Sequence, residues 1–186
     1  STPPAYTSPN INMRDDKMKI TMIVALDEDG FIGMEGHLPW RISSDLTRFK
    51  RLTKGDGFNA VVMGRKTWDS LPNSFRPLPE RLNIVMSRDT GWDHDDAENA
   101  LYPGRAIEIA YADGCEECWI IGGGQIYEMF LEHVDEIHLT TVHTSKSGDV
   151  VFPVWERENW VETKMEETEI DENNEFCTTY SVWKRK

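Results

Sequence analysis

One carboxylate of this chain lies on the predicted interior face of a helix. The helix is indicated by apolar residues at helical spacing, namely Ile42, Leu46, Phe49 and Leu52. Asp45 lies three residues after Ile42 and four before Phe49, so it falls within their stripe. A carboxylate there is costly to desolvate unless it meets a cation or several donors, and this favours a role in binding or proton chemistry. The spacing equally allows a carboxylate that simply occupies the first helical turn, where the helix dipole stabilises it.

Three predicted strand ends carry groups that can hold an anion. They are Gly64-Arg65-Lys66-Thr67, Ser87-Arg88 and Gly122-Gly123-Gly124-Gln125. Ligands of open α/β sheets bind beyond the carboxyl ends of strands, where free backbone N–H groups can donate hydrogen bonds to phosphates. The glycine triplet alone fails the GxGxxG fingerprint at Tyr127 and is equally explained as a tight turn, and Arg65 or Lys66 alone as a solvated charge. Together the three junctions predict a ligand with several anionic groups, such as a dinucleotide.

Three further residues have two interpretations each. Trp40 is either a core anchor or a residue whose indole N–H holds a water molecule near Asp45. Arg76 and Arg81 bracket a Pro-Leu-Pro segment, and an arginine fork can hold a carboxylate with two hydrogen bonds. Surface exposure is the alternative for both arginines, and for Arg76 it is the favoured one.

The remaining chemistry-bearing residues predict no metal site. The five histidines are scattered without metal-ligand spacing, and no Ser-His-Asp arrangement is legible. Cys115 and Cys118 have CxxC spacing but no second pair, so we interpret them as small residues at a loop-to-strand junction. With Cys177 they make an odd number of cysteines, which argues against a disulfide framework.

Composition narrows the classes of partner. The 186 residues include 20 Lys+Arg and 33 Asp+Glu, and the formal net charge of −13 argues against binding of nucleic acid or an anionic membrane. No apolar run approaches the roughly 18 residues that span a bilayer, and no signal-peptide pattern opens the sequence. We therefore expect a cytoplasmic protein, and a monomer by default.

The elements that must position these residues alternate between strand and helix. Residues 1–18 read as a flexible extension, and residues 19–186 as a single domain. Strands are predicted at 19–26, 58–63, 81–87, 118–121 and 136–142, and helices from 43, from 65, near 105–112 and from 124 to 131. Alternating segments at 160–166 and 176–184 suit an antiparallel hairpin. The sum is an α/β fold: a mostly parallel central sheet with helices on both faces and a C-terminal antiparallel edge hairpin.

From about Lys19 to Arg185 the chain resembles dihydrofolate reductases. The shared segments are Ile23-Val-Ala-Leu26, Ile32-Gly-Met34, Leu38-Pro-Trp40, Asp45-Leu46, Phe49-Lys50, Val62-Met-Gly-Arg65, Thr67-Trp68, Arg76-Pro-Leu-Pro79 with Arg81, Ile121-Gly-Gly-Gly124 with Tyr127, Gly148-Asp149 and Phe152-Pro153. Their number and order make the resemblance specific. It implies that NADPH gives a hydride to the pterin ring of 7,8-dihydrofolate, whose adjacent ring nitrogen gains a proton to yield tetrahydrofolate.

The resemblance also implies a role for each matching residue. Asp45 would hold the amino and ring N–H groups of the pterin and promote its protonation, through water near Trp40. Arg81 would clamp the α-carboxylate of the glutamate tail, with Arg76 nearer the tail. The folate site would be lined or supported by Ile23, Leu46, Phe49, Leu71, Leu78 and Thr140.

The same resemblance implies an NADPH site. Its residues would be Ala25, Ile32, Gly33, Gly64, Arg65, Lys66, Thr67, Ser87, Arg88, Ile121, Gly122, Gly123, Gly124, Gln125, Ile126 and Tyr127, with a cis Gly122-Gly123 peptide. Arg65, Ser87 and Arg88 would surround the 2′-phosphate. Gln125 stands where many bacterial relatives carry a second phosphate-facing arginine, which weakens the expected preference for NADPH over NADH. Residues 33–40 would close over the nicotinamide, steadied by Asp149.

Two other functions compete with this one. The related reductase of riboflavin synthesis also uses NADPH and shares the Gly64-Arg65-Thr67 and Gly122-Gly123-Gly124 features, but acts on a ribosyl pyrimidine. Asp45 after Trp40, with Phe49 and Arg81, favours a pterin with a glutamate tail. The second alternative is a binding protein that kept the fold and lost turnover.

Overall fold

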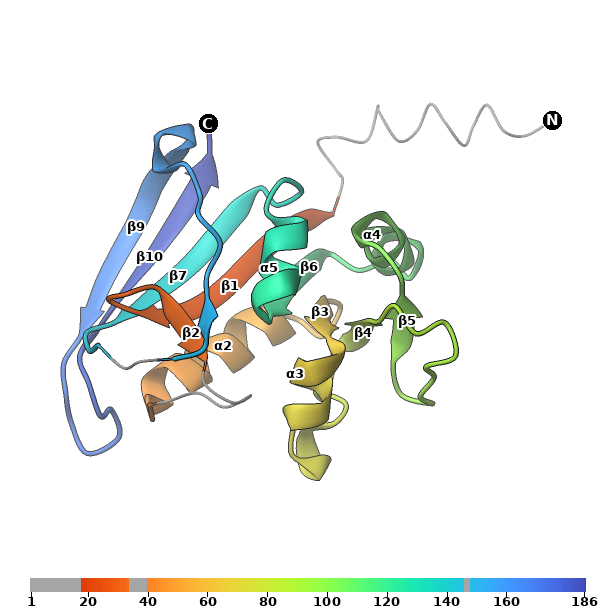
Figure 1. The fold of residues 1–186 in the computed structure, drawn as a ribbon, viewed down its shortest axis with the longest axis horizontal. Coiled ribbons are helices and arrows are strands. Elements are labelled where there is room, and N and C mark those ends of the chain that lie inside the picture. The colour runs from red at the N-terminus through yellow and green to blue at the C-terminus, as the bar shows by residue number, and fades with distance from the viewer. Residues whose placement is uncertain (1–17, 34–39, 146–147) are drawn as a thin grey trace.

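The computed structural model describes residues 18–33, 40–145 and 148–186, which form an α/β fold (Figure 1). Residues 1–17 of the predicted extension and residues 34–39 of the predicted closing loop lie outside the described part of the chain. The first described segment enters the sheet directly, since Met18 is buried and strand β1 (Lys19–Asp27) begins at the next residue.

An eight-stranded sheet organises the fold in the order β5-β4-β3-β6-β1-β7-β10-β9. With β1, its strands are β5 (Glu98–Ala100), β4 (Leu82–Met86), β3 (Ala60–Gly64), β6 (Glu117–Gly122), β7 (Glu136–Val142), β10 (Thr178–Arg185) and β9 (Trp160–Thr168). Neighbours from β5 to β7 pair in parallel, whereas β10 pairs antiparallel with both β7 and β9. The predicted sheet with its C-terminal edge hairpin is therefore confirmed.

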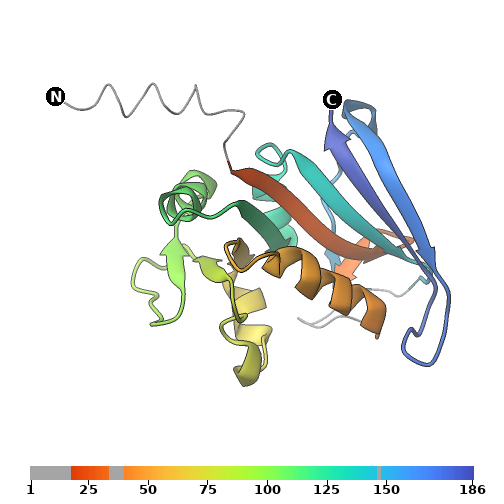
Figure 2. The same ribbon diagram turned by 180° about the vertical axis from the view of Figure 1, so that it is seen from behind.

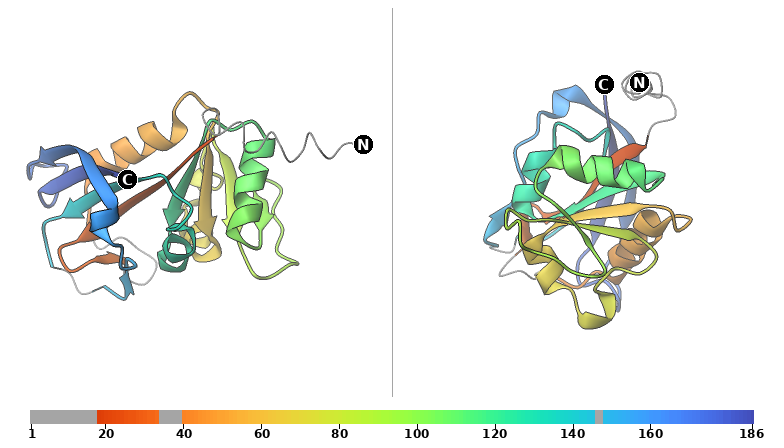
Figure 3. Two further views of the ribbon diagram at one scale, coloured as in Figure 1. Left: turned by 90° about the horizontal axis from the view of Figure 1, so that it is seen from above. Right: turned by 90° about the vertical axis from the view of Figure 1, so that its right-hand side faces the viewer.

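Helices cover both faces of the sheet, as predicted. They are α2 (Ser43–Lys54), α3 (Arg65–Ser70), α4 (Pro103–Ala112) and α5 (Gly124–Phe130), with short 3-10 turns at Asn73–Phe75 and Arg157–Asn159. Helix α5 lies in front of the sheet in Figure 1, and α2 comes forward in the view from behind (Figure 2). Seen from above, α2 and α5 lie on opposite sides of the strands (Figure 3, left).

Two apolar clusters explain why the central strands are continuous hydrophobic runs. In β3, Val62 belongs to the cluster under α4 and α5, whereas Val61 and Met63 belong to the cluster under α2 and α3. All three side chains are fully buried. Because alternate residues of a strand point to opposite faces, a strand covered on both faces must be apolar at every position.

The elements that sequence reasoning missed are short. Strand β5 has three residues, and a second, two-stranded sheet pairs β2 (Phe31–Gly33) with β8 (Val150–Val151). Gly148 allows β8 to approach β2, because a Cβ at Gly148 would lie 2.6 Å from the carbonyl oxygen of Gly33. Segments of two or three residues carry no periodicity, so only the tertiary contact reveals them.

Two of the three cysteines are buried in the core. Cys115 and Cys118 are free thiols just before and within β6, and burial raises their pKa values to about 11 and about 12. Within the described ranges, no helix is long and apolar enough to cross a membrane, and no group of three or more His, Cys, Asp or Glu side chains could hold a metal ion.

Phe130 tests the packing of α5 on the sheet. It is fully buried, whereas its neighbour Met129 is 40% exposed. We expect Phe130→Ala to lower the free energy of unfolding by about 3–5 kcal/mol, because it leaves a cavity in the core. Met129→Ala, the matched control, should change it by only about 0.5 kcal/mol. Urea denaturation measures both, and equal losses would contradict this orientation of α5.

Candidate active site

Asp45 lies in the first turn of α2 and faces the sheet, so both interpretations of its spacing hold at once. Its carboxylate oxygen Oδ1 accepts a hydrogen bond of 2.7 Å from the Thr140 hydroxyl on β7. Arg48, one turn further along α2, donates to the same oxygen at 3.1 Å. The Asp45 side chain is 20% exposed. Both of these donors hold Oδ1, and no residue in the described ranges donates a hydrogen bond to Oδ2.

The start of α2 is fixed from the far end of the chain. The backbone N–H of Ser44 donates to the side-chain carbonyl of Asn174 at 3.0 Å, and the Ser44 hydroxyl donates to the same oxygen at 2.9 Å. Asn174 is buried in the connection between β9 and β10. A donor of the first helical turn is thereby satisfied, and Asp45 is held at a defined height above the sheet.

Burial raises the pKa of the Asp45 carboxyl above its ordinary value. The hydrogen bond from Thr140 and the positive charge of Arg48 act in the opposite direction. A carboxyl group under opposed influences of this kind is suited to accept hydrogen bonds as an anion and to take part in proton transfer.

Apolar side chains gather on the face of the sheet that α2 covers. Leu78 is buried in the cluster with Trp68 and Trp119, and partly buried Ile23, Phe49 and Leu71 pack against that cluster. Leu46 is 54% exposed on α2, as expected for the wall of an open site. Trp40 is buried with Ile42, Val142 and partly buried Ala25, which confirms its interpretation as a core anchor. Its contact with a water molecule stays a prediction.

The two arginines near the Pro-Leu-Pro segment have different partners. Arg81 donates to the Thr53 hydroxyl at the end of α2 and to the carbonyl of Pro79, each at 2.9 Å. Arg76 donates to the backbone carbonyls of Trp68, Asp69 and Leu71 and so closes the end of α3. The favoured interpretation of Arg76 as an exposed surface charge is therefore wrong: a partly buried guanidinium satisfies helix-end carbonyls that have no intrahelical donor.

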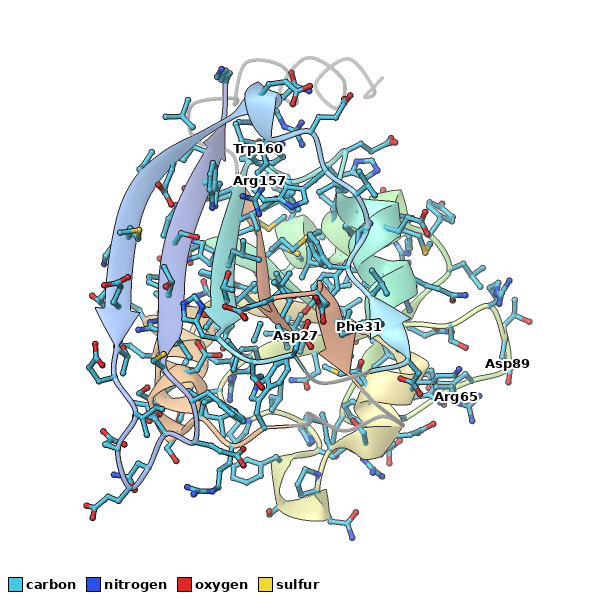
Figure 4. The ribbon with its side chains drawn as sticks, turned by 60° about the vertical axis from the view of Figure 1, so that its left-hand side comes forward. Asp27, Phe31, Arg65, Asp89, Arg157 and Trp160 are labelled. Carbon is cyan, nitrogen blue, oxygen red and sulfur yellow. The ribbon has the colours of Figure 1, made fainter. Side chains whose placement is uncertain are left out.

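The residues predicted to bind anions gather at the carboxyl ends of β3, β4 and β6. These strands are neighbours, so Arg65, Ser87 and the glycine triplet share one edge. Arg65 lies 3.6 Å from Asp89 and 3.6 Å from Asp69, and its proximity to Asp89 is visible in Figure 4. Thr67 Oγ1 would lie 3.7 Å from a Cβ placed on Gly123, which joins the loops after β3 and β6.

The glycines at this edge allow the neighbouring elements to pack closely. The Gly122-Gly123 peptide is cis, as the resemblance implied, and Gly122 has φ +120°. A Cβ on Gly64 would lie 2.9 Å from Ile126, and one on Gly124 would lie 2.7 Å from Val150 and 4.0 Å from Ile32. At each of these positions a side chain would collide with its surroundings, so only glycine lets the strands, α5 and β8 meet this closely.

Tyr127 marks the point where two central strands separate. The last parallel pair of β1 and β6 joins Met22 to Ile120. Just beyond it, the Tyr127 hydroxyl lies 2.8 Å from the carbonyl oxygen of Ile23 and 2.9 Å from that of Ile121. Burial raises the pKa of this phenol, which keeps it protonated as a donor. The Tyr127 hydroxyl thus lies between the ends of β1 and β6, where their pairing stops.

The turn after β1 brings β2 alongside β1. Oδ1 of Asp27 accepts hydrogen bonds from the backbone N–H groups of Asp29 at 2.9 Å and Phe31 at 3.0 Å, and Figure 4 shows Asp27 beside Phe31. The carbonyl of Gly33 accepts from the backbone N–H of Asp149 at 3.0 Å. Asp149 therefore meets the first residue of the predicted closing loop, whose residues 34–39 lie outside the described ranges.

Two groups of residues escaped sequence reasoning. A hollow of about 250 Å³ lies beyond β4 and β5, lined by Thr90, Asn99, Leu101, Tyr102 and Arg105. Asn99 Oδ1 is buried and accepts no hydrogen bond within the described part of the chain. Arg48 was also missed, although its position three residues after Asp45 on one helix is a recognisable pairing signal.

Comparison with known proteins decides the family. The family model described as dihydrofolate reductase matches residues 19–185. The chain belongs to the dihydrofolate reductase family. It is 38% identical over 170 residues to the dihydrofolate reductase of Staphylococcus haemolyticus, covering 90% of this chain and 96% of that protein. It is 41% identical over 145 residues to the enzyme of Mycobacterium leprae, covering 76% and 84%.

A solved structure supports the same assignment. Dihydrofolate reductase from Enterococcus faecalis, complexed with NADP(H) and RAB-propyl, matches with a TM-score of 0.80 and 30% identity. The match covers 90% of this chain and 96% of that one. The parallel sheet and the C-terminal edge hairpin of this chain are therefore those of the dihydrofolate reductase fold.

The bond from Thr140 to Asp45 can be tested by replacing the hydroxyl. We expect Thr140→Val to raise the pKa of Asp45, because the hydrogen bond from Thr140 stabilises the ionised carboxylate. Thr141→Val, on the opposite face of β7, is the matched control. Carbon-13 NMR of labelled aspartate measures the titration, and an unchanged Asp45 curve in Thr140→Val would show that this bond does not influence the carboxylate.

Proposed function

We propose that this chain catalyses the NADPH-dependent reduction of 7,8-dihydrofolate to 5,6,7,8-tetrahydrofolate. Membership of the dihydrofolate reductase family and the similarity to an NADP(H)-bound structure support this activity. The observation that carries it is the Asp45 carboxylate, held by Thr140 on an apolar face beside the edge where the glycine and arginine junctions meet.

Asp45 is proposed to bind the pterin ring. Its Oδ2 can accept hydrogen bonds from the ring N–H and the amino group, while Oδ1 stays anchored to the protein. A nearly buried carboxylate makes strong charge-assisted bonds because little water competes. In this proposal Asp45 promotes protonation of the ring nitrogen through a water molecule, and Trp40 helps to hold that water.

The remaining folate contacts follow from the same face. Ile23, Leu46, Phe49, Leu71 and Leu78 provide apolar surface for the flat ring and its aromatic linker. Arg81 lies further along, near the end of α2, where its guanidinium can hold the α-carboxylate of the glutamate tail. Thr140 acts through Asp45, whereas Arg76 supports the site by closing α3.

The cofactor edge fits NADPH in shape and charge. When bound, NADPH supplies the hydride. The glycines at 64 and 122–124 lie at the ends of β3 and β6, and Arg65, Ser87 and Arg88 come from the neighbouring strand ends. These side chains are proposed to hold the 2′-phosphate. The hollow lined by Thr90, Asn99, Leu101, Tyr102 and Arg105 lies beside these strand ends and is proposed to take the adenosine part of the cofactor.

The rest of the proposed cofactor set surrounds the opening between β1 and β6. Tyr127 sits beneath it and orients the two strand ends, while partly buried Ala25 and Gly33 approach from β1 and β2. The other members of the set are Ile32, Lys66, Thr67, Ile121, Gln125 and Ile126.

We further propose that the enzyme is a cytoplasmic monomer with one domain at residues 19–186. The family match over residues 19–185 supports the single domain. Asp45, Thr140 and Arg81 all come from one chain, so the proposed folate site needs no second copy. Free cysteines suit a reducing compartment, and the net charge of −13 disfavours nucleic-acid or anionic membrane partners.

Replacing Asp45 tests the reaction. We expect the wild-type protein to oxidise NADPH only with dihydrofolate present, and Asp45→Asn to lower turnover by roughly 10²–10⁴-fold, because the amide cannot promote protonation. The loss should be largest at neutral to high pH, where free protons are scarce. NADPH affinity, followed by quenching of tryptophan fluorescence, should be unchanged. Oxidation with a ribosylaminopyrimidine but not with dihydrofolate would instead identify the riboflavin-type reaction.

The 2′-phosphate site can be tested by removing its charges. We expect Arg65→Ala with Arg88→Ala to narrow the preference for NADPH over NADH, since each charge-assisted contact contributes about 1.5–3 kcal/mol. Arg157→Ala is the control, because Arg157 lies far from Arg65 at the other end of the sheet (Figure 4). The measurement is the ratio of kcat/KM for the two cofactors. An unaltered ratio would place the 2′-phosphate elsewhere.

A further inference from the structure

Arg48 is a buried cation that joins the proposed catalytic carboxylate to the edge hairpin. Its side chain is 8% exposed. Nη1 lies 3.1 Å from Oδ1 of Asp45, and Nη2 lies 3.0 Å from Oε1 of Glu166 on β9. The guanidinium carbon lies 4.1 Å from the centre of the Tyr180 ring on β10. One side chain of α2 thus meets two strands that begin more than 100 residues later in the sequence.

The aromatic platform under Arg48 is itself held in place. The Tyr180 hydroxyl and His138 Nδ1 are 2.6 Å apart, and His138 Nε2 lies 2.7 Å from Glu136. Glu136 also forms ion pairs with Lys19 at 3.2 Å and Lys184 at 3.7 Å. Because Tyr180, His138 and Glu136 are all buried, the ring cannot swing away easily. Arg48 is therefore fixed from below as well as from both sides.

Pairing with Glu166 alone would not require this burial. Glu166 is 51% exposed, so an arginine could meet it in solvent without being desolvated. The buried position instead brings the guanidinium to Asp45, where little water screens the attraction between them. The full cost of burying Arg48 is thus offset partly by the carboxylate that faces the substrate site.

We propose that Arg48 is a positioning residue that keeps Asp45 ionised and aimed at the pterin, and so sets the pH range in which the enzyme binds dihydrofolate. This inference rests on the proposed function. The bond to Oδ1 fixes one end of the carboxylate, and the positive charge favours its anionic form. The donors of the pterin then always meet a charged acceptor at Oδ2.

The charges around Asp45 give the direction of the effect. Arg48 on α2 and the Thr140 hydroxyl on β7 contact Asp45 directly, the Tyr127 phenol on α5 interacts with it electrostatically, and Glu166 on β9 and Tyr180 on β10 face it through Arg48. Burial raises the pKa of Asp45, and of these groups Arg48 is the cation in contact that lowers it. Without that cation a larger fraction of Asp45 is protonated at any acidic pH. Binding that needs the anion then fails at a higher pH.

The test compares three variants of α2 by two measurements. Arg48→Met removes the charge and keeps an apolar stem, Arg48→Lys keeps the charge, and Arg51→Met removes an exposed charge one turn away. Carbon-13 NMR of labelled aspartate follows the titration of Asp45. The acid limb of kcat/KM for dihydrofolate follows the same ionisation through activity.

We expect Arg48→Met to move both curves to higher pH. An opposite charge in contact moves a carboxyl pKa by about 1–3 pH units in proteins, so kcat/KM on the acid limb should fall roughly tenfold or more. Arg48→Lys should restore most of the wild-type position, and Arg51→Met should leave it unchanged. If Arg48→Met lowers only the melting temperature and leaves both curves in place, Arg48 is merely structural and the proposal is wrong.

Glu166→Gln separates charge from packing. It removes the second carboxylate that shares Arg48, so more of the positive charge acts on Asp45, and both curves should move to lower pH. Movement of both curves to higher pH, in the same direction as for Arg48→Met, would show that Glu166 does not compete for the charge of Arg48, and that result would overturn the proposal. If the NMR curves move as expected but no variant and no wild-type protein reduces dihydrofolate, then the proposed function fails while the pairing of Arg48 with Asp45 stands.

Discussion

The hydrogen bond from Thr140 to Asp45 is the contact on which the site depends. It joins residues that are 95 positions apart and ties the first turn of α2 to the middle of the sheet. A carboxylate with little exposure is tolerated only when donors reach it, so α2 must cross β7 at the place where Thr140 points up. The apolar side chains of α2 pack against the sheet, but the hydrogen bond from Thr140 to Asp45 fixes the position of α2 along β7. Asn174, in the connection between β9 and β10, holds the start of the helix at that position.

A second constraint is the separation of β1 from β6. Parallel strands that stop pairing expose carbonyl groups, and here the Tyr127 hydroxyl lies within reach of the carbonyls of both Ile23 and Ile121. Ligands of open α/β sheets bind where neighbouring strands diverge in this way. In the proposed function, the ring held by Asp45 and the cofactor held at the glycine edge meet where these two strand ends diverge.

Sequence reasoning recovered the elements whose pattern is long enough to be periodic. The apolar runs of β1 and β3, the stripe of α2 and the alternating hairpin strands each follow from burial, and each is present in the structure. Asp45 emerged from the same logic, since a charge within an apolar stripe signals a partner. Thr140, Leu71 and Leu78 came only from the family resemblance, because nothing in a strand's sequence tells which threonine faces a particular helix. The prediction that Arg76 is an exposed surface charge was wrong for a related reason. Its partners are backbone carbonyls at the end of α3, which lack intrahelical donors only because the helix ends there.

Arg48 shows most clearly why the remaining contacts of the site could not be predicted from the sequence. Its pairing with Asp45 is local, but its burial depends on Tyr180 and Glu166, which the antiparallel hairpin brings to α2. The two carboxylates it joins differ in exposure. Solvent and salt screen the outer pair with Glu166, whereas the inner pair with Asp45 is shielded from both. An arginine suits this position better than a lysine, because its planar fork reaches two carboxylates through separate nitrogens while its flat face stacks on the Tyr180 ring. A lysine ammonium could still supply positive charge to Asp45, but it could not also bind Glu166 through a second nitrogen and stack on Tyr180, so the full link from the hairpin to Asp45 requires the guanidinium.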